Sequence, residues 1–233
     1  MRTLIAFFIL LFSFTTQINA VEYFEKLPQF SRIEISGRMT VQIETYGDNI
    51  VTNTENTMKI NVKSGSIKDI DYYMSGETLV LRKKAGVFQT RSMIITLNIS
   101  NKISQLDVSA GALVRTFRNV FDERAEIRAE SGSYLDLFVD TSSLFINCGR
   151  DSSVLMKGRI NHIETRAVNS GLIDAELLTV SRAFVYAYTG STIKINALEY
   201  LEATAGMKSS IYYKEGAAVK HLSELAGGQY IEF

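Results

Sequence analysis

The chain has 233 residues with 25 basic and 25 acidic side chains, so its formal net charge is zero. An apolar fraction of 46% against 21% charged excludes a disordered chain. The balanced charge argues against nucleic acid as a partner, because phosphate binding needs clustered Lys and Arg. One Cys and two His exclude an internal disulfide, and they lead us to expect no metal site and no cofactor.

Residues 1–20 have the pattern of a secretory signal peptide. Arg2 precedes an apolar run from Leu4 to Phe14, and polar residues then lead to the small residue Ala20. The uninterrupted apolar part ends at Phe12, well short of the roughly 20 residues that span a bilayer. A membrane anchor is the alternative interpretation. We predict an exported domain over residues 21–233, in the periplasm, on the outer surface or secreted, with no membrane span after cleavage.

The rest of the chain is predicted to be all-β. Apolar and polar residues alternate in several short runs, and turns rich in Gly, Asn, Asp and Ser separate them. The clearest runs are Ile33–Ile35, Val41–Ile43, Leu79–Leu81 and Met93–Ile99. No stretch of ten or more residues keeps apolar positions at helical spacing.

From about residue 101 to 215 the strands repeat with a period near 20 residues. The repeating turns are centred on Gly111, Gly132, Asp151, Gly171, Gly190 and Lys208. Three residues before each centre a small apolar residue recurs: Val108, Ala129, Cys148, Val168, Ala187 and Ala205. Five residues before, the column is apolar except at Arg166: Leu106, Ile127, Ile146, Arg166, Val185 and Ala203. Such columns predict a parallel β-helix with coils of about 20 residues.

An evenly spaced antiparallel sandwich is the alternative architecture. In the fourth repeat Ile173 comes one position early, as a one-residue deletion would produce. Residues 21 to about 100 do not keep the period. We expect them to form irregular early coils or a β cap over the solenoid end, which would otherwise expose unpaired strand edges.

Most side chains that could take part in catalysis have a structural explanation. Cys148 lies in the small inward column, where a thiol acts as a small hydrophobe. Ser191 and Lys194 match a Ser-x-x-Lys spacing, but on a strand they point to opposite sides. His162 is predicted to lie in a turn between strands. We therefore predict no catalytic residue.

Two features keep a function on the outer surface open. Asp136 and Asp174 come into register if the deletion precedes Ile173, and would then form an outward acidic pair. Tyr186, Tyr188 and Tyr212 are predicted to point outward, where rings could bind a sugar or a protein. The alternative for the tyrosines is that their strand propensity suits them to outward positions.

The mature chain resembles a bacterial family, the putative auto-transporter adhesin, head GIN domain family. The resemblance rests on "FSRIEISGRMTVQIE", "ISQLDVSAGALV", the Ser-Gly turns at 131–132 and 170–171, and "SSIYYKEGAAVKHLSELAGG". It covers roughly residues 30 to 228. The chain departs from the family pattern at Arg150-Asp151 and Met207-Lys208. The resemblance implies a right-handed parallel β-helix and an envelope or secreted location in gram-negative bacteria. It implies no catalytic residues.

Together these observations favour an exported, non-enzymatic β-helix module with an adhesion-like or scaffolding role. Its expected partner is a surface glycan or an envelope protein, and homo-oligomers could form through coil edges. The alternative hypothesis is a polysaccharide-active enzyme that uses an outward acidic face at Asp136 and Asp174.

Overall fold

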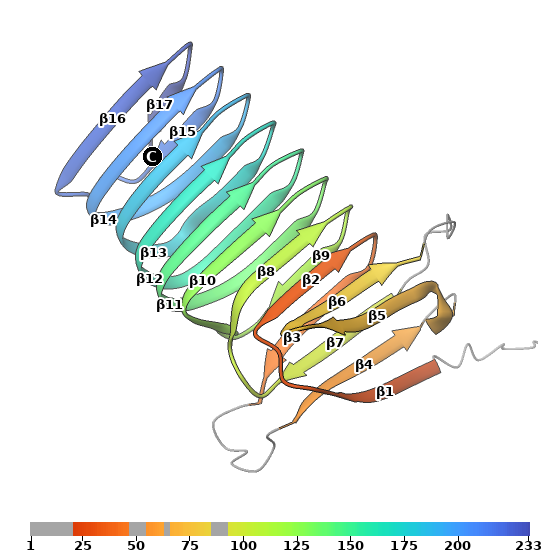
Figure 1. Ribbon diagram of the computed structural model, residues 1–233. Coiled ribbons are helices and arrows are strands. Elements are labelled where there is room, and N and C mark those ends of the chain that lie inside the picture. Colours follow the sequence, from red (N-terminus) through yellow and green to blue (C-terminus); the bar gives the residue numbers. More distant parts are fainter. Residues whose placement is uncertain (1–20, 47–54, 63–65, 85–92) are drawn as a thin grey trace, which may run out of the picture.

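The computed structural model describes residues 21–46, 55–62, 66–84 and 93–233. The predicted signal peptide lies outside the described residues. The described chain is built almost entirely of strands, stacked as coils of a β-solenoid (Figure 1). The strands are β1 (Val21–Leu27), β2 (Arg32–Ser36), β3 (Thr40–Thr45), β4 (Asn56–Val62), β5 (Ile70–Ser75), β6 (Thr78–Lys83), β7 (Met93–Ile99), β8 (Ile103–Ser109), β9 (Leu113–Thr116), β10 (Phe121–Ala129), β11 (Tyr134–Cys148), β12 (Ser153–Ala167), β13 (Leu172–Ala187), β14 (Thr192–Gly206), β15 (Ser210–Tyr213), β16 (Val219–Leu225) and β17 (Gln229–Glu232). A short 3-10 helix, η1, covers Ile67–Asp69.

Neighbouring coils pair in parallel. One inward column runs through directly paired residues that lie 18 to 21 positions apart in the chain: Val114, Leu135, Val154, Ile173, Ile193 and Ile211. The long strands β11 to β14 run down one layer, bend, and return in the other layer (Figure 1). The prediction of an all-β parallel solenoid with coils of about 20 residues is therefore confirmed, and the antiparallel sandwich is wrong.

From β8 onward, tight two-residue turns close the coils at one edge. Both central residues of each turn have positive φ, the geometry of a type I′ turn. The pairs are Ala110-Gly111, Ser131-Gly132, Arg150-Asp151, Asn169-Ser170, Thr189-Gly190, Met207-Lys208 and Ala226-Gly227. The amide after the pair donates to the carbonyl before it in several turns, as from Ser152 to Gly149 at 3.2 Å. The pattern of two left-handed residues, rather than Gly itself, defines the repeat.

This geometry corrects the fourth repeat. Its turn centre is Ser170 rather than Gly171, so the positions assigned before the turn move by one residue. Ile173 is then three residues after the turn centre, like the inward residue of the other repeats, and the predicted one-residue deletion is not needed. The inward residues are Thr165 and Ala167, paired with Ile146 and Cys148 of the preceding coil. Arg166, the exception in the predicted apolar column, therefore points outward. Its side chain is exposed.

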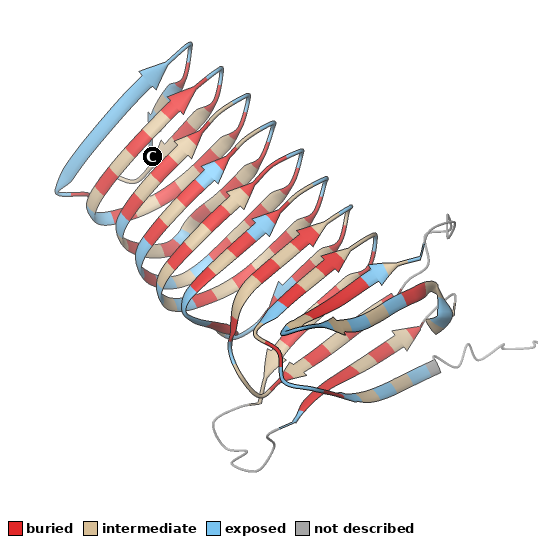
Figure 2. Cartoon of the chain, in the orientation of Figure 1, coloured by how far each residue is buried: buried red, intermediate tan, exposed pale blue. Residues whose placement is uncertain are grey.

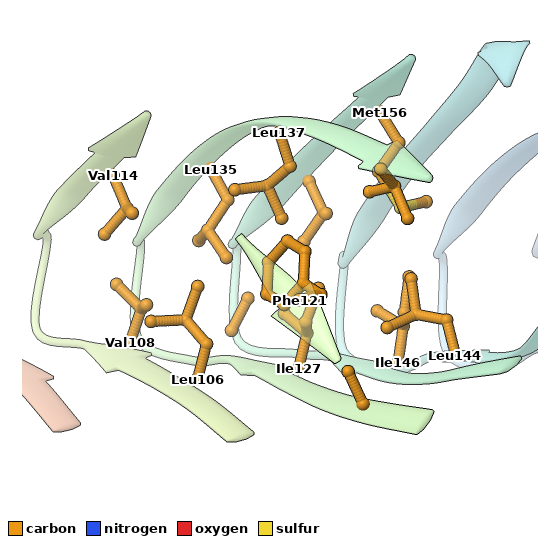
Figure 3. Packing of buried hydrophobic residues seen from close by; sticks show 14 of the residues in the cluster. Leu106, Val108, Val114, Phe121, Ile127, Leu135, Leu137, Leu144, Ile146 and Met156 are labelled. Atoms are coloured by element: carbon orange, nitrogen blue, oxygen red, sulfur yellow. The ribbon is translucent and has the colours of Figure 1, made fainter. Parts of the chain in front are cut away.

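The two layers enclose a narrow apolar core. Side chains of one layer point toward those of the other, as Leu106 and Ile127 do toward Val114 and Leu135 (Figure 3). These residues are fully buried, and the alternation of buried and partly exposed residues runs along each long strand (Figure 2). Because the ladder holds coils about 4.8 Å apart, each side chain packs against those of the coils above and below.

The N-terminal region combines a coil with a cap. β2 and β3 form a coil that pairs in parallel with β8 and β9 on one side and with β6 and β7 on the other. β4 then pairs antiparallel with β7, β1 antiparallel with β4, and β5 antiparallel with β6. The predicted irregular N-terminal cap is present. It covers the end of the stack that would otherwise expose unpaired strands.

The stack continues past residue 215 at the other end. β16 pairs in parallel with β14, and β17 with β15. Tyr230 points inward there, and its hydroxyl lies 2.9 Å from both the Ala205 amide nitrogen and the Ala203 carbonyl oxygen. No described helix is long and apolar enough to cross a membrane.

Candidate functional site

One outer surface of the solenoid carries aromatic and charged side chains in register. It consists of the outward residues of β8, β10, the second halves of β11 to β14, and β16, and we call it the ring face. Because strand residues alternate in direction, every second residue of these strands points outward. Three outward rows run across the coils: Ser143, His162, Arg182, Tyr200 and Val219; Phe145, Glu164, Phe184, Glu202 and His221; Asn147, Arg166, Tyr186, Thr204 and Ser223.

Four rings form a continuous ladder over successive coils. His162 stacks on Phe184 with ring centroids 5.7 Å apart and an interplanar angle of 25°. Phe184 contacts Tyr200 at 5.5 Å, and Tyr200 contacts His221 at 5.7 Å. The rings alternate between two adjacent rows, so each lies diagonally above the last. Contacts at this separation stabilise aromatic pairs beyond simple burial.

A second cluster surrounds Arg166. Its guanidinium carbon lies 5.6 Å from the ring centroids of both Phe145 and Tyr186, within the range of a cation–π contact. Arg166 Nη2 also lies 2.9 Å from Glu164 Oε1 on the same strand. Burial, as the largest cause, raises the pKa of Tyr186 above its ordinary value. Tyr186 therefore stays a neutral hydroxyl at physiological pH.

A shallow hollow of about 320 Å³ opens beside the ring ladder. It is lined by His162, Arg182, Phe184, Glu199, Tyr200 and Val219. Arg182 Nε lies 3.6 Å from Glu199 Oε2, and the Tyr200 hydroxyl donates a 2.9 Å hydrogen bond to Glu202. The hollow thus combines apolar ring surface with a balanced pair of charges at its rim.

The three tyrosines singled out in the sequence do not share a surface. Tyr186 is half-buried on the ring face near the end of β13, and Tyr188 is half-buried just after the strand ends at Ala187. Tyr212 lies on β15 in the other layer, where it pairs with Lys194 of β14. The structure therefore brings Tyr186 and Tyr188 together with the ring ladder and separates Tyr212 from them.

Most of the rings on this face were not predicted from the sequence, and the predicted position of His162 in a turn is wrong. His162 lies within the continuous strand β12, because the chain bends there without a turn, and it begins the ladder instead of standing alone. Phe145, Phe184, Tyr200 and His221 were not singled out. If the alternation before each turn is followed two positions further toward the N-terminus, it places Phe145, Phe184 and His221 in one outward row.

The proposed acidic pair is not assembled. Asp136 and Asp174 do share an outward row, but Leu155 of the intervening coil lies between them. Asp174 Oδ2 is 3.2 Å from Lys194 Nζ, and Lys194 Nζ is also 3.7 Å from Glu176 Oε2. A glycosidase needs two carboxylates facing one bond, and here the nearer acids are paired with a cation.

The remaining residues considered for catalysis, Cys148, Ser191 and Lys194, are buried or ion-paired in the structure. Cys148 is buried, with its thiol 3.2 Å from the Ser152 carbonyl oxygen, and burial raises its pKa to about 12. Ser191 is buried and donates to the Tyr188 carbonyl at 2.6 Å, while Lys194 points outward to Asp174. Over the described residues no group of three or more His, Cys, Asp and Glu side chains converges as a metal site would require.

Residues 29–217 match the family described as "Putative auto-transporter adhesin, head GIN domain". This match covers most of the chain and all of the regular coils from β8 to β15. The chain belongs to this family. Membership supports an adhesion-like role and an exported or surface location, and it favours a protein without enzymatic activity.

Several solved structures share the fold of this chain. One titled a putative adhesin from Bacteroides fragilis superposes with a TM-score of 0.78 at 17% identity, covering 92% of this chain and 97% of that one. A putative adhesin from Parabacteroides merdae gives 0.74 at 16%, covering 92% and 96%. A putative lipid binding protein from Parabacteroides distasonis gives 0.62 at 14%, covering 92% and 97%. At these identities the likeness shows the head GIN fold alone. No curated protein matches the chain.

Proposed function

We propose that this head GIN protein is an exported, non-enzymatic binding module that attaches to a surface glycan at the bacterial cell envelope through its ring face. The observation that carries the proposal is the ladder His162–Phe184–Tyr200–His221, joined on the same face by Arg166 between Phe145 and Tyr186. An exposed surface with contiguous rings marks an interaction site more often than scattered tyrosines do.

The chemistry of this face suits a polyhydroxylated ligand. Ring edges and the Phe184 side chain offer apolar contact for the C–H groups of a sugar. Charged groups on this face occur as pairs, and two of the pairs lie within one strand: Glu126–Arg128 at 2.6 Å and Glu164–Arg166 at 2.9 Å. Each pair places donors beside acceptors, which matches hydroxyl groups that both donate and accept. Because the charges balance, an uncharged glycan fits better than a strongly anionic one.

The opposite outer surface is the weaker candidate. Its tyrosines, Tyr134 on β11 and Tyr212 on β15, lie on separate coils and in different outward rows. On the coils between them, the outward positions in the same two rows hold Leu, Ser, Thr and ion-paired residues such as Asp174 and Lys194.

The proposal is tested by binding the purified protein to an array of bacterial and host glycans. The variant Phe184→Ser/Tyr200→Ser removes the middle of the ladder, and Tyr134→Ser on the other layer is the matched control. We expect retention by a subset of glycans, loss of at least about tenfold in affinity for the ladder variant, and no loss for the control.

The length of any bound polysaccharide is measured after incubation with the protein. An unchanged length agrees with a binding module. Shortened chains would contradict the proposal and favour an enzyme. If no glycan on the array is retained, the glycan assignment fails, and crosslinking in intact cells would then identify a protein partner and support a scaffolding role.

A further inference from the structure

The C-terminal end of the solenoid presents an uncovered strand. β16 pairs with β14 alone among the described strands, so its other edge carries free backbone donors and acceptors. All seven residues of β16 are exposed, and the strand is pale blue along its length in Figure 2. Val219 is 45%, Leu222 40% and Leu225 50% exposed. An exposed edge of this kind either pairs with another chain or carries features that prevent it.

The inward positions of β16 prevent one kind of pairing. Lys220 and Glu224 occupy positions that hold Leu201 and Ala205 in the coil below. A further coil stacked in the same direction would bury these charges against apolar inward residues that offer them no partner, and burying charges in this way is costly. The end therefore resists continuation of the parallel stack, and with it head-to-tail fibres.

The same residues favour an antiparallel partner with the same sequence. If two copies of β16 pair antiparallel about a two-fold axis through Leu222, each Lys220 lies opposite Glu224 of the other copy. Val219 then lies opposite Leu225, and Leu222 meets its own copy. Inward residues face inward residues throughout, because each pair of partners has the same parity along the strand. Opposite charges across a strand pair stabilise it, and like charges destabilise it.

We propose that β16 is a homodimer interface, through which two copies of the chain join end to end by antiparallel β16–β16 pairing. The pairing satisfies the free backbone edge and covers the three exposed apolar side chains. Within one chain Lys220 Nζ already lies 3.6 Å from Glu232 Oε1. In the dimer, Glu224 of the other copy would add a second carboxylate beside the same ammonium group.

The symmetry has a consequence for binding. A two-fold axis perpendicular to the sheet leaves both ring faces on the same side of the dimer. Two ligand sites on one side would act together on a repetitive surface and raise the avidity. Dimerisation through β16 does not require a glycan. The dimer and the glycan-binding function can therefore be tested, and refuted, independently of each other.

The test is the mass of the purified protein in solution, measured by sedimentation or light scattering over a concentration series. We expect wild-type protein to approach twice the monomer mass as concentration rises. Lys220→Glu and Glu224→Lys should each be monomeric, because each places like charges opposite one another. The double variant Lys220→Glu/Glu224→Lys should dimerise again, since it restores opposite charges.

Mixing the two monomeric single variants gives a sharper result. An equimolar mixture should form a heterodimer, in which every charge at positions 220 and 224 meets its opposite. Lys157→Glu, on the exposed side of β12, is the control and should leave the dimer intact, and circular dichroism confirms that each variant is folded. A wild-type monomer at all concentrations would overturn the proposal. So would a dimer that neither single reversal weakens.

Discussion

Cys148 is held in a column of small inward residues, between Ala129 of β10 and Ala167 of β12. The side chain is buried, and the thiol lies close to the carbonyl oxygens of Ser152 and Leu172. Burial raises its pKa to about 12, so the thiol remains neutral throughout the physiological range. Since the thiolate is the reactive form, a buried neutral thiol is chemically inert.

The folded protein should therefore resist thiol reagents. At pH 8 we expect Cys148 to react with a disulfide reagent at least about a hundredfold more slowly than free cysteine, and to react fully after denaturation. The absorbance of the released thiol measures both rates. Rapid reaction in the folded protein would mean that the column opens, and would contradict the packed core.

The ionised carboxylate of Asp107 lowers the stability of the folded protein. It is half-buried in an outward row between Glu34 and Arg128, and its Oδ1 lacks a hydrogen-bond partner among the described residues. Gln105 donates to Oδ2 at 2.8 Å. Burial, as the largest cause, raises the pKa of Asp107 above its ordinary value, and the nearby Arg128 opposes this only in part.

A raised carboxyl pKa means that the folded protein holds the proton more tightly than the unfolded chain. Stability then falls as the pH rises from the ordinary carboxyl range through the raised pKa, and at pH 7 the ionised group opposes folding. Asp107→Asn should melt at a higher temperature than wild type at pH 7, and the difference should vanish below about pH 4. A variant less stable at pH 7 would contradict this, and the exposed Asp140→Asn serves as control.

At the scale of elements, the type I′ turns set the coil edge. Lys208 and Gly190 occupy the same position in successive turns, with φ of 61° and 71°. An L-residue other than Gly pays roughly 1–2 kcal/mol for this conformation, partly offset by the greater freedom of Gly in the unfolded chain. Lys208→Gly should stabilise the protein by about 0.5–1 kcal/mol.

The reverse substitution, Gly190→Ala, meets no atom within 4 Å and should destabilise by a similar amount. Thermal melting measures both, with an expected shift of about 2–4 °C per kcal/mol for a chain of this size. Equal melting temperatures for the wild type and both variants would show that the turns tolerate either residue.

Gly158 marks a different constraint inside a strand. It has φ +123° and pairs directly with Val139, and an added Cβ would lie 2.0 Å from the Val139 carbonyl oxygen. Both the backbone conformation and the close approach of the neighbouring coil exclude a side chain. Gly158→Ala should cost about 3 kcal/mol or more, several times the effect of Gly190→Ala. A melting temperature within one degree of wild type would contradict this.

At the scale of the whole molecule, the regular coils could be predicted because their inward columns repeat in the sequence. The inward column Val114 to Ile211 is apolar in every coil, so periodicity alone identifies it. The coil of β2 and β3 could not be placed in this way. It lies between strands that follow it in the chain, β6 and β7 on one side and β8 and β9 on the other, and no repeat in sequence encodes that order.

The ring ladder could not be predicted for a related reason. It depends on the register of outward residues across coils, and paired residues lie between 18 and 21 positions apart because the bends differ in length. An error of one residue, as at Gly171 and Ser170, exchanges inward and outward positions throughout a coil. The pairing of Glu164 with Phe184 and of Arg166 with Tyr186 fixes the register across the fourth repeat, and with it the place of His162 in the ladder.

If the ring face of this adhesin-family solenoid is its binding surface, a bound envelope must cover the rings. The most direct measurement is hydroxyl-radical footprinting of the purified protein with and without isolated bacterial envelope, read by mass spectrometry at individual rings. We predict that bound envelope protects Phe184, Tyr186 and Tyr200, while oxidation of Tyr134 and Tyr212 on the other layer is unchanged. Protection at Tyr134 and Tyr212 with an unprotected ring ladder would contradict the claim.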